Sequence, residues 1–265
     1  MFQTKSLKTL NTFGLGGEGQ VAYPKTREEL IALLKSEPEA VILGGGSNSV
    51  FPDGTFSKKI IGTQFVNTIE EIKSTGEVAA DCGARLSKIF DFAAGVPATV
   101  GGGVRINFGA LNKEVSQYLI NTTVFDRKTQ EIKILSNKEC SYGYRSSSIK
   151  KNNQVVLSAR FKKPETYNVL EVVKWRNQKQ PLSFKNAGSV FKNPPGNFAG
   201  KLIEEAGCKG LQVGELKVWE GHCNMFVNTG TGTTQQLEEL IAEVRSRVLK
   251  HSGVSLELEL EIHHG

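Results

Sequence analysis

Glycine is the residue type that most constrains this chain, because it is both abundant and clustered. The sequence holds 28 glycines in 265 residues, above the usual share of about 7%. Triplets stand at Gly44–Gly46 and Gly101–Gly103, whereas Gly143 is the single glycine between Ala110 and Ala187. Glycine has no Cβ, so its backbone can approach a ligand closely and adopt positive φ. The clustering therefore predicts two or more ligand-binding loops.

Composition and charge are those of an ordinary globular protein. Charged residues make up 23% and hydrophobic residues 38%, which excludes disordered, collagen-like and disulfide-dense small chains. The net charge of +6 fits an anionic small molecule, and we expect no nucleic-acid partner. The four cysteines are far apart without a C-x-x-C pair, so we expect reduced thiols and no metal site. No apolar run suits a signal peptide or a membrane span, so we expect a cytoplasmic protein without membrane contact.

The first two of three expected units carry the glycine loops. In residues 1–62, the capping box Thr26-Arg27-Glu28-Glu29 opens a helix, and the short strand Ala40–Leu43 leads into the first triplet. Residues 63–163 are rich in strands and include a short helix at Leu86–Ala93. The second triplet lies in a loop of this unit. The strands expected in these two units are Lys58–Gly62, Phe65–Ile72, Glu77–Asp81, Thr122–Phe125, Glu131–Leu135 and Gln154–Phe161.

The third expected unit, residues 164–265, contains three helices and a strand at its end. Short helices fit Val169–Arg176 and Ala199–Ala206. A long amphipathic helix opens at Thr233-Thr234-Gln235-Gln236 and ends at Gly253. The tail Ser255–Ile262 alternates leucine or isoleucine with glutamate, a pattern typical of a half-buried strand.

Each glycine loop has a chemical interpretation and a plain structural one. Gly44-Gly45-Gly46-Ser47-Asn48 offers consecutive backbone N–H groups that suit a phosphate or diphosphate. It lacks a P-loop lysine, and Val50-Phe51-Pro52 follows it instead of the helix of a dinucleotide fingerprint. The second loop, 94–110, is built almost entirely of small residues, which suits backbone packed against a large flat ligand. Either loop alone could be a tight turn, whereas together they predict the two ends of a bound dinucleotide.

Six sequence blocks, spread over nearly the whole chain, resemble the UDP-N-acetylenolpyruvoylglucosamine reductase (MurB) family. The most specific is Gly188-Ser189-Val190-Phe191-Lys192-Asn193-Pro194. The short length is similar to the compact subtype, which lacks a long tyrosine loop over the substrate. The six blocks are Asn11–Gly17, Leu43–Asn48, Gly95–Ala110, Tyr142–Ser147, Asn186–Pro194 and Gly253–Glu259.

The resemblance implies an α+β fold. Its two-part FAD-binding region, of the PCMH or vanillyl-alcohol-oxidase type, would comprise residues 1–62 and 63–163. An α+β substrate domain would comprise 164–265, and its last strand would return to the FAD region. The cofactor-binding residues so implied are Leu43, Gly44, Gly45, Gly46, Ser47, Asn48, Gly95, Val96, Pro97, Thr99, Val100, Gly101, Gly102, Arg105, Asn107 and Gly109.

The resemblance also implies an activity. The protein would be a monomeric, FAD-dependent oxidoreductase that uses NADPH to reduce UDP-N-acetylglucosamine enolpyruvate to UDP-N-acetylmuramate. That reaction belongs to peptidoglycan precursor synthesis and so to cell-wall biogenesis, cell shape and cell division. Two alternatives stay open: an FAD-dependent oxidase on the same scaffold, and a non-catalytic nucleotide-binding relative.

Three residues are catalytic by this resemblance. Ser189 would be the general acid, because a hydroxyl can protonate the strongly basic carbanion or enolate that hydride addition produces. The guanidinium of Arg145 can bind the substrate carboxylate with two hydrogen bonds and stabilise the charge that grows there. The alternating tail cannot choose among Glu257, Glu259 and Glu261, and only the family pattern selects Glu259, which would assist Arg145. Candidates for binding the UDP-sugar are Lys179, Lys192, Asn193, His222 and Asn224.

Overall fold

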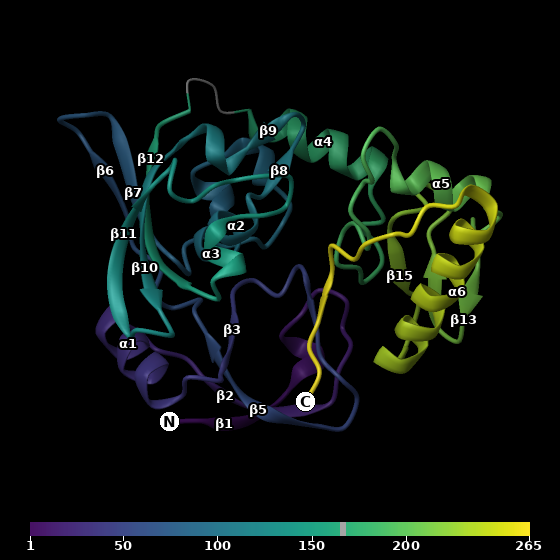
Figure 1. Cartoon of the computed structure of the whole chain (residues 1–265), viewed down its shortest axis with the longest axis horizontal. Helices are drawn as coiled ribbons and strands as arrows, with labels where there is room; N and C mark the ends of the chain where they lie inside the picture. Colours follow the sequence, from purple (N-terminus) through teal and green to yellow (C-terminus); the bar gives the residue numbers. More distant parts are fainter. Residues whose placement is uncertain (165–167) are drawn as a thin grey trace. The chain divides into compact units, whose positions relative to one another are not determined.

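Helices and strands are interspersed along the chain, so the fold is α+β, as expected (Figure 1). The computed structural model describes residues 1–164 and 168–265. The chain divides into two compact units, whereas the division into three expected from the sequence stays a prediction. Unit one consists of Met1–Gln3, Gln20–Gly45 and Lys58–Val173. Unit two consists of Thr4–Gly19, Gly46–Ser57 and Lys174–Gly265.

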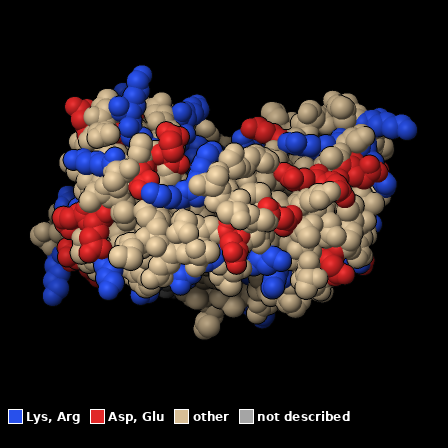
Figure 2. All heavy atoms as spheres, turned by 90° about the horizontal axis from the view of Figure 1, so that it is seen from below, with Lys and Arg blue, Asp and Glu red and all other residues tan. Residues whose placement is uncertain are grey.

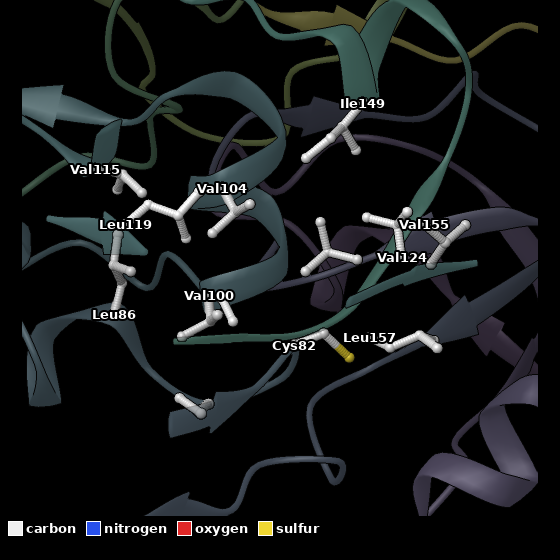
Figure 3. Packing of buried hydrophobic residues seen from close by; sticks show 14 of the residues in the cluster. Cys82, Leu86, Val100, Val104, Val115, Leu119, Val124, Ile149, Val155 and Leu157 are labelled. Carbon is white, nitrogen blue, oxygen red and sulfur yellow. The ribbon is translucent and has the colours of Figure 1, made fainter. Parts of the chain in front are cut away.

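A five-stranded antiparallel sheet organises unit one. Its strand order is β11-β10-β12-β7-β6. The strands expected in this sheet are confirmed, except that the one expected over Phe65–Ile72 begins at Ile69. Side chains from the sheet and from α2 form one buried cluster, part of which Figure 3 shows around Val100 and Leu157. The strands are β6 (Ile69–Ile72), β7 (Glu77–Asp81), β10 (Leu119–Asp126), β11 (Glu131–Ser136) and β12 (Val155–Lys162).

A second sheet positions the first glycine loop. Its order is β1-β2-β5-β3, and β3 pairs parallel with β5 and runs directly into Gly44. The helix α1 (Arg27–Ser36) begins where expected, because the Thr26 side chain accepts a hydrogen bond from the N–H of Glu29. The Glu29 carboxylate caps the N–H of Lys25 rather than that of Thr26. The strands are β1 (Gln3–Ser6), β2 (Glu18–Ala22), β3 (Val41–Leu43) and β5 (Thr55–Gly62).

Unit two packs two helices beside a three-stranded antiparallel sheet, β13-β14-β15. The long helix α6 (Thr234–Ser252) is confirmed, with a complete capping box between Thr233 and Gln236 and with Gly253 in the left-handed conformation at its end. The other elements are β13 (Gln212–Val213), β14 (Leu216–Val218), β15 (Phe226–Asn228), α4 (Val169–Lys179), which spans the boundary between units, and α5 (Ala199–Glu205).

The tail does not form the long strand expected over Ser255–Ile262. Only β16 (Glu261–Ile262) pairs regularly, in parallel with β4 (Ser49–Val50). The N–H groups of Glu259 and Leu260 both point at one carbonyl, that of Val190, which interrupts the ladder. The prediction was wrong for most of the tail, because its partner segment is an irregular loop rather than a strand.

The second glycine triplet was expected in a loop, but it lies in the helix α2 (Val100–Ile106). Thr99 opens this helix by accepting a hydrogen bond from the N–H of Gly102. Packing explains two of the glycines, because a Cβ at Gly103 would lie 2.8 Å from Leu86 and one at Gly101 would lie 3.1 Å from Cys82. Tertiary packing therefore overrides the poor helix propensity of glycine.

The helix expected at Leu86–Ala93 is instead two turns of 3₁₀-helix, η2 (Leu86–Lys88) and η3 (Asp91–Ala93). Phe90 interrupts them in an extended conformation, with its side chain fully buried in the core. The remaining short elements are η1 (Leu7–Thr9), β8 (Gly109–Ala110), β9 (Lys113–Glu114), η4 (Val115–Gln117) and α3 (Ser148–Lys151).

Membrane spans, metal sites and stripes of basic surface residues are three features that would indicate particular ligands. Among residues 1–164 and 168–265, no helix has the length and apolar character to cross a membrane, and no three His, Cys, Asp or Glu side chains gather as a metal site would require. On the face drawn in Figure 2, basic and acidic side chains are interspersed. Basic residues therefore do not form a continuous stripe on that face.

Candidate functional site

The first glycine loop packs against the second predicted cofactor segment within unit one. A Cβ at Gly45 would overlap the carbonyl oxygen of Pro97, and a Cβ at Gly44 would overlap the hydroxyl of Thr99. Leu43, just before the loop, is buried and accepts a hydrogen bond from the N–H of Thr63. Glycine is thus required at both positions for this close approach, and the structure brings together two segments that lie about fifty residues apart.

The N–H groups of the first loop are available to a ligand. In the part of the chain that the structure describes, the backbone N–H groups from Gly44 to Asn48 donate no hydrogen bond. Buried or half-buried N–H groups nearly always have partners. Consecutive free N–H groups in glycine-rich turns bind anions in many proteins, and the phosphate-binding role of this loop stays a prediction.

Three predicted cofactor residues hold the turn that carries Arg145. All of these contacts lie within unit one. The hydrogen bonds run from Ser147 Oγ to Arg105 O (2.5 Å), from Asn107 Nδ2 to Gly143 O (3.2 Å) and from Arg145 Nη2 to Gly109 O (2.7 Å). The segment that follows α2 therefore acts as a support for the arginine.

Asn107 is the most constrained residue of that support. It ends α2 in the left-handed conformation (φ 52°) and is 1% exposed. Its amide also donates to Glu114 Oε2 at 2.9 Å and accepts from the N–H of Ser116 at 3.0 Å. The amide thus has polar partners within unit one on both its nitrogen and its oxygen.

Arg145 itself has a strained backbone and an ordered side chain. Its φ is 52°, which costs energy for a residue other than glycine and is common at functional sites. The guanidinium carbon lies 5.1 Å from the centre of the Tyr144 ring, so a cation–π contact adds to its hydrogen bond with Gly109. Tyr144 was not predicted as a site residue, although an aromatic side chain next to the arginine could have indicated it.

In unit two, the Ser189 segment lies between the tail and the residues that lead into β15. Ser189 forms an isolated antiparallel bridge with Met225, and Phe191 forms one with Leu258. Gly188, with φ 74° and open space around it, precedes the half-buried Ser189. The structure therefore brings the predicted acid next to the glutamate-bearing tail, whereas Arg145 belongs to unit one.

The three tail glutamates differ in their surroundings. The Glu257 side chain is 73% exposed, and its carboxylate lies 2.5 Å from Lys192 Nζ. Glu259 is half-buried, and its N–H donates to Val190 O at 2.9 Å, beside Ser189. Asn48 anchors this stretch, because its Nδ2 donates to Glu259 O and its carbonyl accepts from Glu261 N, both at 3.0 Å. Of the three glutamates, Glu259 is thus the one whose backbone forms the shortest hydrogen bond with the residue next to Ser189.

The predicted substrate-binding residues fall into two groups in unit two. Lys179 is exposed at the end of α4, and His222 is exposed and accepts a hydrogen bond from Asn224 N at Nδ1. Lys192, Asn193 and Asn224 lie on or against the Ser189 segment. Asn193 Oδ1 accepts from the N–H of Ala199 at the start of α5, 3.0 Å away.

The surroundings of the four cysteines disfavour the thiolate form. All four are free thiols and buried. Burial raises the pKa of Cys140, Cys208 and Cys223 above the ordinary value, and it raises that of Cys82 to about 12. Thiols with such pKa values carry almost no thiolate at neutral pH.

Comparison with known proteins identifies the family. Residues 180–263 match the family model of the UDP-N-acetylenolpyruvoylglucosamine reductase C-terminal domain. The reductase of that name from Streptococcus pneumoniae strain JJA is 36% identical over 94% of this chain and 89% of its own length, and that from strain CGSP14 is 37% identical over the same shares.

A solved structure agrees with this assignment. The UDP-N-acetylenolpyruvylglucosamine reductase (MurB) of Thermus caldophilus superimposes with a TM-score of 0.81 at 29% identity, over 100% of this chain and 99% of the other. The agreement thus extends well beyond the residues that the family model matches. The chain belongs to the UDP-N-acetylenolpyruvoylglucosamine reductase family.

Proposed function

We propose that this protein reduces UDP-N-acetylglucosamine enolpyruvate to UDP-N-acetylmuramate, with FAD as its cofactor and NADPH as its reductant. The observation that carries the proposal is the pairing of the Ser189 segment with the Glu259 tail in a member of this family. A hydroxyl beside a half-buried carboxyl side chain suits proton delivery better than nucleophilic attack. The product would enter peptidoglycan precursor synthesis and so serve cell-wall biogenesis, cell shape and cell division.

The cofactor would be held by the two glycine-rich segments. The free N–H groups from Gly44 to Asn48 suit the FAD diphosphate, and Gly95–Gly102 would contact the cofactor through the exposed backbone around Gly102. Arg105, Asn107 and Gly109, first expected to bind FAD, would act mainly through the Arg145 turn that they support. FAD, once reduced, would supply hydride to the methylene carbon of the enolpyruvyl group.

Three side chains would complete the reaction. Arg145 would bind the substrate carboxylate, because a planar guanidinium matches a carboxylate and stabilises the negative charge that grows on it. Ser189 Oγ would donate its proton to the carbon that bears the ether oxygen. Glu259 would assist Arg145 in stabilising the enol-like intermediate. One hydride and one proton added across the double bond give the lactyl ether, so the reaction balances.

The UDP-sugar would be bound by the basic and amide groups of unit two. Lys179, Lys192 and His222 would face the diphosphate, while Asn193 would recognise amide or hydroxyl groups of the sugar. We also propose a monomer in the cytoplasm, where a soluble UDP-sugar and NADPH meet this enzyme.

Turnover tests the proposal. Purified protein should carry FAD and oxidise NADPH rapidly only when the enolpyruvyl substrate is present. Ser189→Ala should let NADPH reduce the flavin at the normal rate, yet it should lose at least about a hundredfold in the substrate-dependent step. Rapid flavin reoxidation by oxygen without the sugar nucleotide would instead indicate an oxidase, and protein without FAD would indicate a non-catalytic relative.

The glutamate assignment has its own test. Glu259→Gln should slow the substrate-dependent step by about a hundredfold. Glu257→Gln is the matched control, because the side chain of Glu257 is exposed and pairs with Lys192. It should keep that step within about threefold of the normal rate, since an exposed ion pair contributes little. The reverse order of the two losses would move the assignment to Glu257.

A further inference from the structure

Asn224 makes an unusual set of contacts with the two residues that follow Ser189. It is 3% exposed. Its carbonyl oxygen accepts from Val190 N at 2.9 Å, its Oδ1 accepts from Phe191 N at 3.0 Å, and its Nδ2 donates to Phe191 O at 2.8 Å. One buried residue therefore bonds three successive peptide groups, from the one that joins Ser189 to Val190 to the one that joins Phe191 to Lys192.

The side chain of Asn224 forms hydrogen bonds with Phe191 that the backbone of a neighbouring strand would otherwise form. The regular strand β15 begins only at Phe226, and Ser189 meets Met225 in an isolated bridge. A primary amide presents an acceptor oxygen and an N–H donor on the same edge, so it can bond the N–H and the C=O of one residue at once, as a residue of an antiparallel partner strand does. The Asn224 amide therefore continues the pairing where the backbone of β15 does not provide it.

The other side of the Ser189 segment is held by the tail. Glu259 N donates to Val190 O at 2.9 Å, and Lys192 N donates to Glu257 O at 2.8 Å. The residues just after the serine are thus hydrogen-bonded from both sides. The freedom of the serine hydroxyl is then reduced largely to rotation about its own Cα–Cβ bond.

We propose that Asn224 is a positioning residue that acts on the reaction through Ser189, rather than a substrate ligand. The inference rests on the proposed role of Ser189 as the proton donor. The Asn224 amide uses its oxygen and one N–H on the Phe191 backbone and so holds the loop in place. Proton transfer requires that the Ser189 hydroxyl lie within hydrogen-bond distance of the carbon that receives the proton. Loss of the clamp should therefore reduce the rate of protonation and leave substrate affinity nearly unchanged.

The test is a double-mutant cycle on the full-length enzyme with FAD bound. Asn224→Ala should slow the substrate-dependent step by tenfold to a hundredfold, because a shift of about 1 Å costs roughly that much. Flavin reduction by NADPH and the Kd of the UDP-sugar should change by less than about threefold. In the Ser189→Ala background, Asn224→Ala should add no further loss, since the group that it positions is gone.

Two further variants separate positioning from general damage. Asn224→Asp keeps the size of the side chain and the acceptor for Phe191 N but removes the donor to Phe191 O, so it should fold and still lose about tenfold. Asn228→Ala is the matched control, because Asn228 is equally buried on β15 and its amide bonds to Phe13, Gly230 and Gly232 instead. Asn228→Ala should lower the melting temperature and leave the substrate-dependent step unchanged.

The outcomes are distinguishable. If Ser189→Ala leaves the substrate-dependent step at full rate, the proposed acid and the inference built on it both fail. If Ser189→Ala abolishes that step but the Asn224 loss is additive to it, or appears as weaker substrate binding, the proposed function stands and the positioning role is overturned.

Discussion

Gly102 offers a sharp test of whether the start of α2 approaches FAD, because nothing in the chain itself requires glycine there. A Cβ at Gly102 would meet only the Thr99 hydroxyl, at an ordinary 3.5 Å, and the residue is exposed. By contrast, an added Cβ on either side of it would be crowded, at 3.1 Å from Cys82 for Gly101 and at 2.8 Å from Leu86 for Gly103. The substitution Gly102→Ala therefore changes little in the protein, and any large effect must come from a ligand.

The two expected effects have opposite signs. In a helix interior, alanine is more favourable than glycine by about 1 kcal/mol, and at this first-turn position we expect about half of that. The protein without FAD should thus melt about 1–2 °C higher. A methyl group forced between the helix and a cofactor costs about 2 kcal/mol. The Kd for FAD should therefore rise about thirtyfold.

Both quantities can be measured on one preparation. Flavin is removed, the melting temperature is recorded by calorimetry, and FAD is titrated back while its fluorescence is followed. Gly143→Ala is the matched control, because an added Cβ at Gly143 would meet nothing within 4 Å and Gly143 was not predicted to bind the cofactor. If Gly102→Ala binds FAD as tightly as the unmodified protein, the backbone of α2 does not contact the cofactor at this residue and the reasoning fails.

Three other predictions concern stability and reactivity. Gly45→Ala should lower the free energy of unfolding by about 3 kcal/mol in urea titrations, because its Cβ would overlap the Pro97 carbonyl, which cannot rotate away; a loss below about 1 kcal/mol would show that the loops separate easily. Cys82, with its pKa raised to about 12, should be the slowest of the four thiols to react with a disulfide reagent in the native protein at pH 8, and equal rates would contradict its burial. A hydrogen bond from Lys133 lowers the pKa of Asp126 to about 2, so its stabilisation is complete above about pH 4 and is lost as the pH falls through 2. Asp126→Asn should thus cost about 1 kcal/mol at pH 6, after allowance for solvent screening, and this gap should close in urea titrations between pH 4 and 2; a gap independent of pH would exclude the carboxylate as its cause.

Elements with strong local signals were predicted well. α6 carries a capping box at Thr233, an apolar stripe and Gly253, and these signals lie within the helix and its two ends. The strands β10, β11 and β12 were predicted for the same reason. Their type follows from runs of β-branched and aromatic residues, such as Thr122–Phe125 in β10 and Val155–Val156 in β12.

The predictions were wrong where contacts with distant parts of the chain determine the secondary structure of a segment. The glycines of α2 lower its helix propensity, and the contacts with Cys82 and Leu86 that favour the helix come from elsewhere in unit one. The tail alternates like a strand, but its partner, the Ser189 loop, does not offer a regular edge. The resemblance identified Ser189 and the glutamate-bearing tail, whereas the contacts that hold them could not be deduced from spacing.

The contacts that support the proposed catalytic residues have one chemical feature in common, an asparagine amide bonded to a backbone carbonyl. Irregular segments do not form long ladders, so their backbone groups need other partners when they are buried. Here buried or half-buried asparagines provide them: Asn107 reaches Gly143 across 36 residues, Asn224 reaches Phe191 across 33, and Asn48 reaches Glu259 across 211. Each asparagine amide meets a segment that carries a proposed catalytic residue. The irregular backbone around each proposed catalytic residue thus depends on an amide clamp, and a substitution at any of the three asparagines should disturb the reaction before it disturbs the core.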